Sequence, residues 1–184
     1  MDRRTYCTAV GSASLVSLAG CVGSVDGHVR PDGEPDTVPT EFVCEVDGFE
    51  PHFEGYSEDT LHWGDTEDFS LRVNDLAFEY GDTAEIQLSR GTTGNRHKWN
   101  LEVDTENGWQ EVRGTTAEFL DYTAEDTDGG HEWTLELTES GIVDSSFHDD
   151  SLQVCPDLVS GRYRFVYWGL IGDDSVAVAF DLAV

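Results

Sequence analysis

The sequence predicts an all-β protein built as an antiparallel sandwich. About eight short segments alternate apolar and polar residues with a period of two, which is the pattern of half-buried strands in such sandwiches. Gly, Asp and Asn cluster between these segments, where a β-fold needs turns. No stretch shows a sustained apolar stripe with the period of a helix.

The expected strands begin after residue 40 and continue to the C-terminus. The last one shows the pattern clearly, because Val176, Val178 and Phe180 share one face of an extended chain. An Asn-Gly pair at 107–108 is the strongest short hairpin signal in the chain. The predicted strands are residues 41–46, 69–73, 83–88, 97–103, 109–112, 131–137, 161–168 and 175–184.

The first 20 residues have the features of a secretory signal. Arg3 and Arg4 precede a short apolar stretch, and the run Leu-Ala-Gly-Cys ends at Cys21. This pattern resembles a twin-arginine signal peptide fused to a lipobox. The resemblance implies export of the folded protein, cleavage before Cys21 and a lipid on its sulfur. We therefore expect an anchored protein on the extracellular face of the cell membrane.

Residues 21–40 are predicted to be a flexible, lipidated tether. Pro31, Pro35 and Pro39 recur among Gly and Asp, and no apolar periodicity is present. Such a segment is expected to be extended and solvated, and to hold the folded domain away from the membrane.

The charge of the chain excludes a nucleic-acid partner. Asp and Glu number 38 against 10 Lys and Arg, so the formal net charge is -28. A protein that binds the phosphate backbone needs a basic face, which these few cations cannot build. Carboxylates occur in every segment and Lys98 is the only lysine, a composition that resembles proteins of extremely halophilic archaea. The charge thus indicates adaptation to concentrated salt.

Residues 75–184 resemble a bacterial immunoglobulin-like domain of exported lipoproteins. The resemblance rests on a Tyr-Gly turn at 80–81, a Trp-bearing hairpin over 99–112, Gly-x-Tyr-Arg-Phe at 161–165 and a final apolar strand at 177–182. It implies an immunoglobulin-like β-sandwich, with residues 41–74 as an N-terminal extension outside the family core. The family has no common catalytic residues, so the resemblance assigns none here.

Cys7 lies in the signal segment and Cys21 is the expected lipidation residue, so Cys44 and Cys155 remain, and they are predicted to form a disulfide. In exported proteins such a pair is commonly oxidised to a disulfide. Zinc is the alternative, but neither cysteine belongs to a C-x-x-C pair.

No catalytic, cofactor or metal motif is present in the sequence. The histidines lack metal-ligand spacing, and the acidic run at 126–130 departs from a calcium-binding loop at two ligand positions. No cofactor or metal is therefore expected, although loop carboxylates leave a weak calcium site open. The best binding candidates are Trp63, Trp109 and Trp168. If these indoles are exposed, they stack on a sugar or enter a protein groove. The alternative is that they pack in the core.

Two functions are compatible with these features. The first is a lipid-anchored binding or assembly module without catalysis, whose ligand is a protein or a glycan. The alternative is an extracellular hydrolase, or a subunit of one, that uses loop carboxylates and His.

Overall fold

A computed structural model describes residues 27–52, 55–89, 92–116, 127–146, 152–170 and 173–184. Within these residues the regular structure is almost entirely β-strand, and most strand pairs are antiparallel, which confirms the all-β prediction. Two short helical elements accompany the strands: a 3-10 turn at Glu58–Thr60 and α1 at Glu139–Asp144. None of the described helices is long and apolar enough to cross a membrane.

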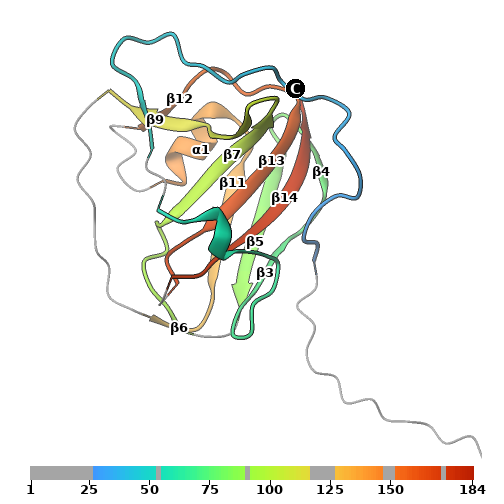
Figure 1. Cartoon of the computed structure of the whole chain (residues 1–184), viewed down its shortest axis with the longest axis vertical. Coiled ribbons are helices and arrows are strands. Elements are labelled where there is room, and N and C mark those ends of the chain that lie inside the picture. The colour runs from blue at the N-terminus through green and yellow to red at the C-terminus, as the bar shows by residue number, and fades with distance from the viewer. Residues whose placement is uncertain (1–26, 53–54, 90–91, 117–126, 147–151, 171–172) are drawn as a thin grey trace, which may run out of the picture.

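The larger sheet has six strands and runs diagonally through Figure 1. Its central strand β13 pairs with β14 on one side and with β7 on the other, both antiparallel. The short strands β2 and β4 both pair in parallel with β14, and β8 forms the opposite edge. The strands are β2 (Leu61–Trp63), β4 (Ala77–Glu79), β14 (Ser175–Ala183), β13 (Gly161–Tyr167), β7 (Trp99–Thr105) and β8 (Gly108–Glu111).

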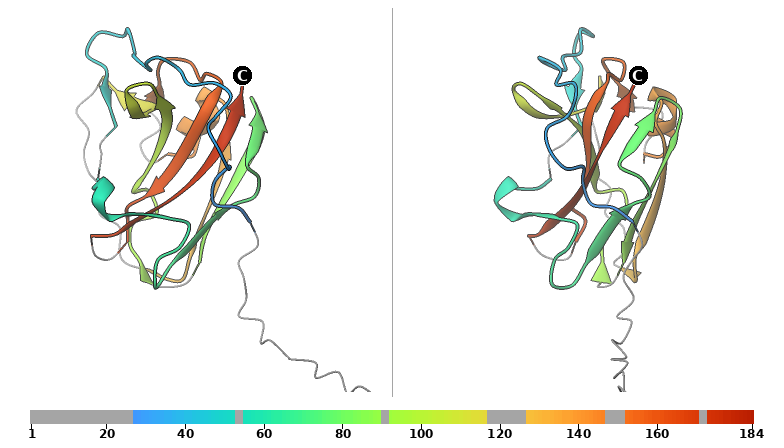
Figure 2. Two further views of the ribbon diagram at one scale, coloured as in Figure 1. Left: turned by 45° about the vertical axis from the view of Figure 1, so that its right-hand side comes forward. Right: turned by 90° about the vertical axis from the view of Figure 1, so that its right-hand side faces the viewer.

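The second sheet has three strands in the order β11-β5-β3. They are β11 (His131–Glu136), β5 (Thr83–Ser89) and β3 (Ser70–Val73). Exposed and buried residues alternate along β5, as the period-two pattern predicts. The right-hand view of Figure 2 shows this sheet and the six-stranded sheet as two layers that face each other.

The apolar core fills the space between the two layers. Trp133 of β11 crosses it, and its ring centroid lies 5.0 Å from that of Phe165 and 5.1 Å from that of Tyr167, both on β13. Trp99 of β7 stacks on Phe165 at 5.1 Å and is fully buried. Large aromatic side chains therefore hold the two sheets together by their buried area.

Two small sheets lie beyond these layers. The first joins β1 (Glu50–Pro51), β9 (Arg113–Thr115) and β12 (Leu152–Val154), and the second joins β6 (Thr92–Thr93) and β10 (Thr127–Asp128). As predicted, Cys44 and Cys155 form a disulfide, with their Cα atoms 5.1 Å apart. This bond attaches the segment before β1 to the loop that follows β12.

The N-terminal part of the chain differs from the expected tether. Residues 27–52 and 55–60, which we call the strap, run along the outer side of the six-stranded sheet (Figure 2). His28 N–H donates to the Val73 carbonyl at 2.8 Å, and Val29 accepts a 2.7 Å bond from Ala179 N–H. The described part of the predicted tether is therefore bound to both sheets, because it supplies backbone partners that neighbouring strands leave open.

Residues 41–74, which were expected to be an N-terminal extension, also contribute strands to the two facing sheets. Strands β2 and β3 lie within this segment, and they belong to the six-stranded and the three-stranded sheet respectively. The strand predicted at 41–46 is absent. Phe42 is instead buried next to β8, where its N–H donates to Gln110 Oε1 at 2.7 Å. The described chain therefore has no boundary near residue 75.

The structure contains the predicted hairpin and, at Tyr163, a contact typical of β-sandwiches. The hairpin between β7 and β8 turns at Glu106-Asn107, and Gly108, the first residue of β8, adopts a φ of 96° that suits only glycine well. Tyr163 Oη donates to the Val159 carbonyl at 2.8 Å, four residues upstream, which is the contact of a tyrosine corner.

Candidate functional site

The outer face of the six-stranded sheet carries polar and charged side chains as well as apolar ones. Because successive residues point to opposite sides of a strand, Asn100 and Glu102 of β7 point away from the core that Trp99 enters. Arg164 of β13 is the register partner of Glu102 and of Ala179 on β14, so it shares this outer face.

All three tryptophans proposed from the sequence lie at this face. Trp63 is on β2, Trp109 on β8 and Trp168 directly after β13. Each is half-buried, and none belongs to the apolar core between the sheets. Of the two alternatives that the sequence left open, core packing is therefore wrong for these three residues.

Trp63 and Trp109 form a pair that is flanked by two arginines. Their ring centroids are 6.5 Å apart, with an angle of 52° between the ring planes. The Arg30 guanidinium, from the strap, lies 5.2 Å from the Trp63 centroid. The Arg164 guanidinium lies 4.5 Å from the Trp109 centroid. The two cation–π contacts each stabilise by about 0.5–2 kcal/mol, so Arg30, Trp63, Trp109 and Arg164 form a continuous row of favourable contacts.

Arg164 is the centre of a buried polar network beneath this pair. Its Nε donates to Glu102 Oε2 at 2.6 Å, and its Nη2 donates to Tyr56 Oη at 2.6 Å. Tyr56 Oη in turn donates to Glu102 Oε1 at 2.7 Å. Glu58, from the 3-10 turn of the strap, forms a second ion pair with Arg164. Arg164, Glu102 and Tyr56 therefore satisfy one another within the sheet and the strap, whereas the Glu58 side chain is 64% exposed.

This environment changes the proton affinities of the network. Burial and the Glu102 carboxylate raise the pKa of Tyr56 far above its usual value. Burial alone would lower the pKa of Arg164, but its bonds to Glu58 and Glu102 leave that pKa raised. Tyr56 is therefore held as a neutral hydrogen-bond donor and Arg164 as a permanent cation.

Trp168 has a different role from the other two tryptophans. Its Nε1–H donates to Asn100 Oδ1 at 3.0 Å, and the Lys98 ammonium lies 5.2 Å from its ring centroid. The backbone of Gly55 packs so closely on the ring that an added Cβ would lie 2.3 Å from it. Trp168 therefore fastens the strap to the sheet, and its ring is largely covered.

A second buried ion pair, Glu111 with Arg113, lies where β8 leaves β7. Glu111 Oε1 accepts from Arg113 Nε at 2.8 Å, and Glu111 Oε2 accepts from Leu101 N–H at 3.0 Å. Arg113 also donates to the Trp99 carbonyl and lies 3.7 Å from the Trp99 ring centroid. Strand β8 pairs with β7 only over β7 residues 102–105. The Glu111 and Arg113 side chains therefore bond to the backbone groups of β7 that precede these residues and have no strand partner on that side.

Sequence reasoning missed the charged residues of this face. Nothing in the local sequence distinguishes Glu58, Glu102 or Glu111 from the other carboxylates of so acidic a chain. The one available signal was Arg164 at an outward position of an apolar strand, since a cation there requires partners on neighbouring strands.

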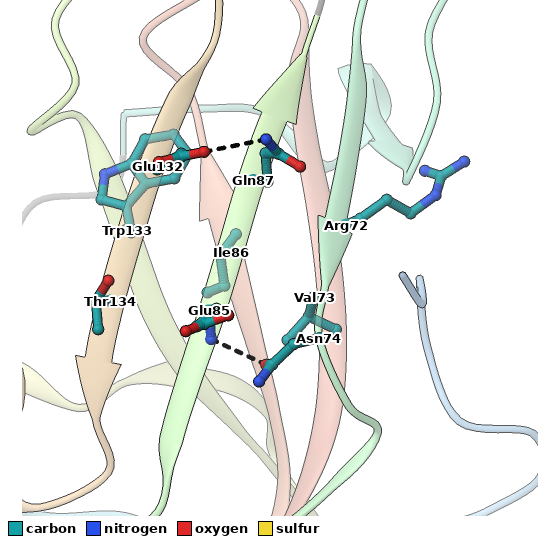
Figure 3. A pocket seen from close by; sticks show the side chains of 9 residues that line it. All are labelled: Arg72, Val73, Asn74, Glu85, Ile86, Gln87, Glu132, Trp133 and Thr134. Atoms are coloured by element: carbon teal, nitrogen blue, oxygen red, sulfur yellow. Dashed lines mark hydrogen bonds between the residues drawn. The ribbon is translucent and has the colours of Figure 1, made fainter. Parts of the chain in front are cut away.

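The outer face of the three-stranded sheet carries a shallow polar hollow of about 270 Å³ (Figure 3). Gln87 Nε2 donates to Glu132 Oε1 at 3.1 Å across it, and Glu85 N–H donates to Asn74 Oδ1 at 2.9 Å. Its lining is mostly polar, and no aromatic pair comparable to Trp63–Trp109 lies over it among the residues that Figure 3 draws.

Several proposed residues lie outside the described part of the chain. These are the twin arginines Arg3 and Arg4, the lipidation residue Cys21 and the start of the acidic run at Asp126. Within the described ranges, no three His, Cys, Asp or Glu side chains come together as a metal site. No family model, curated protein or solved structure matches this chain.

Proposed function

We propose that the protein is an extracellular glycan-binding module, held at the outer face of the membrane by a lipid on Cys21 and without catalysis of its own. The signal features at Arg3, Arg4 and Cys21 support the export and the anchor. We further propose that the fold is an immunoglobulin-like β-sandwich. Two sheets packed face to face and the tyrosine-corner bond of Tyr163 support that class.

The Trp63–Trp109 pair carries the proposal of a binding role. The two indoles are half-buried and lie outside the apolar core, on a face that also carries the polar side chains of Asn100, Glu102 and Arg164. Aromatic rings that are only partly covered offer apolar area for a ligand at low entropic cost. The hydroxyl groups of a sugar suit the polar surroundings, while its apolar ring face suits an indole. A glycan therefore fits this surface better than an apolar protein segment.

The test is retention of the protein on immobilised glycans in concentrated KCl. Trp63→Ala and Trp109→Ala are expected to lose retention on the glycan that binds the native chain. Tyr80→Ala is the matched control, because this exposed aromatic side chain follows β4, at the opposite end of β14 from Trp63, and is expected to leave retention unchanged. Circular dichroism establishes that all three variants are folded. Retention that survives both alanine substitutions contradicts the proposal.

The hydrolase alternative stays a prediction. The carboxylates nearest the tryptophan pair are Glu58 and Glu102, and both form ion pairs with Arg164, whose guanidinium lies over Trp109. Turnover on a panel of glycoside and ester substrates, abolished by substitution of one carboxylate, would favour a hydrolase over the binding module.

A further inference from the structure

The two carboxylates that hold Arg164 are not equivalent. The side chains of Arg164 and Glu102 are 2% and 4% exposed, whereas that of Glu58 is 64% exposed. Glu102 lies within β7 and also accepts bonds from Tyr56 and Asn100. Glu58 lies on a single 3-10 turn of the strap. Arg164 thus has one permanent partner from the sheet and one partner from the surface.

The contact with Glu58 is the one that can exchange. Moving an exposed carboxylate into water costs little, because most of its surface is already hydrated. Removing Glu102 from Arg164 would leave a buried charge without its partner, which is strongly unfavourable. After Glu58 leaves, Arg164 keeps its bonds to Glu102 and to Tyr56 Oη. The guanidinium edge that Glu58 releases is therefore free to take another anion.

The shape of this edge suits a planar or tetrahedral acid group. Glu58 binds it through two nitrogens, with Oε2 at 3.3 Å from Nη1 and Oε1 on Nη2. Two parallel donors on a guanidinium are the geometry that recognises carboxylate and sulfate. Because the guanidinium is desolvated, a bound anion is attracted more strongly here than at the surface.

Aromatic rings surround the same edge. The Arg164 guanidinium lies 4.5 Å from the centroid of Trp109 and 5.7 Å from that of Tyr56. Trp63 continues this surface from Trp109, and the exposed cation Arg30 lies over Trp63 at its far end. A ligand whose acid group reaches Arg164 therefore places the rest of its body over indole rings.

We propose that Glu58 occupies the anion position of a site for an acidic saccharide, and that a carboxylate or sulfate on the sugar displaces it. This inference rests on the glycan-binding function proposed above. Charge complementarity supports it, since Arg164 and Arg30 lie at the two ends of the Trp63–Trp109 pair in a chain of net charge -28. In concentrated salt the remaining carboxylates repel an anionic ligand only at short range.

The experiment compares Glu58→Gln with the native chain, both full length and in concentrated KCl. The probes are oligogalacturonate, a sulfated galactose oligomer and a neutral galactose oligomer of equal length, titrated by tryptophan fluorescence. If Glu58 blocks the site about nine-tenths of the time, removing its charge tightens acidic-sugar binding about tenfold. The neutral oligomer is expected to bind both proteins equally. The two acidic probes show which acid group the site prefers.

Glu85→Gln is the matched control, because it removes one exposed carboxylate from the opposite sheet. Equal tightening in both variants would indicate general charge repulsion and overturn the inference. Unchanged or weaker binding of the acidic sugars by Glu58→Gln would also overturn the inference. So would oligoglutamate that binds Glu58→Gln as tightly as the acidic sugars do. In these cases the glycan-binding function still stands if the neutral oligomer binds and its binding depends on Trp63. If no sugar binds at all, both proposals are contradicted.

Discussion

Trp63 and Trp109 come from opposite edges of the six-stranded sheet, yet their ring centroids lie 6.5 Å apart. Both rings lie inward over the sheet face. Small side chains on the strand next to β2 allow this: Ala177 is the register partner of Trp63, and Ala179 is that of Arg164. Both alanines are buried although they point away from the core. The aromatic pair is therefore supported from below by β14.

Enlarging Ala177 is expected to disturb the pair. Ala177→Leu places a branched side chain under the Trp63 indole at a fully buried position, so we expect a loss of about 1–3 kcal/mol in unfolding free energy. The fluorescence of the tryptophan pair is expected to change as well. Ala183→Leu, at the exposed end of the same strand, is the control and is expected to stay near neutral. Equal stability of the two variants would contradict this role of Ala177.

Gly55 is expected to be intolerant of any side chain. A Cβ at this position would lie 2.3 Å from the Trp168 ring, so Gly55→Ala must displace either the strap or the indole. We expect faster proteolysis of the strap and a lower melting temperature. The double variant with Trp168→Leu is expected to recover part of the loss, since the two sites are coupled by contact. Additive effects in this cycle would show that the two residues act independently.

His52 is expected to make the fold sensitive to acid. Burial, with a contribution from Arg113, lowers the pKa of His52 from 6.5 to about 3. Between these values the unfolded chain binds a proton that the native chain does not, so stability falls as the pH is lowered through this window. The slope is at most about 1.4 kcal/mol per pH unit.

Denaturation of His52→Gln across this pH range tests the assignment. The variant is expected to lose stability less steeply than the native chain on acidification. His62→Gln is the control for replacing an imidazole at an exposed position. A native slope in His52→Gln would assign the acid sensitivity to other groups.

The leader is expected to determine where the protein resides. Cys21→Ser removes the thiol that takes the lipid, so the exported domain should appear in the medium instead of the membrane fraction. Replacing Arg3 and Arg4 together by Lys should retain the protein in the cell. Fractionation and mass spectrometry of the mature N-terminus measure both outcomes. A Cys21→Ser protein that stays with the membrane would contradict a lipid anchor at this residue.

Low salt is expected to unfold the domain. A net charge of -28 repels itself strongly when the Debye length is long. We expect the β-sheet circular dichroism signal to decrease below a few tenths molar KCl, at roughly the concentration where the Debye length exceeds 5 Å. A spectrum that stays constant down to dilute buffer would refute this prediction.

The long strands were predictable because their patterns are local. Residues 83–88 and 161–168 alternate over many positions, and the structure has strands at Thr83–Ser89 and Gly161–Tyr167. The three-residue strands β2 and β4 are too short to show a period, and both owe their conformation to pairing with β14. The alternation at 41–46 is misleading for a related reason. The apolar residues of this segment are held by a hydrogen bond to β8 and by the disulfide, and not by backbone hydrogen bonds to a neighbouring strand.

By itself, the sequence determined the all-β class, the hairpin at 106–108 and the pairing of Cys44 with Cys155. Each depends on a short-range pattern or on the two cysteines that follow the lipidation residue Cys21. The tertiary structure alone decided that Trp63 meets Trp109 and that Glu58 meets Arg164. These contacts join residues far apart in the chain, and their strength comes from burial and alignment that exist only once the sheet and the strap have assembled.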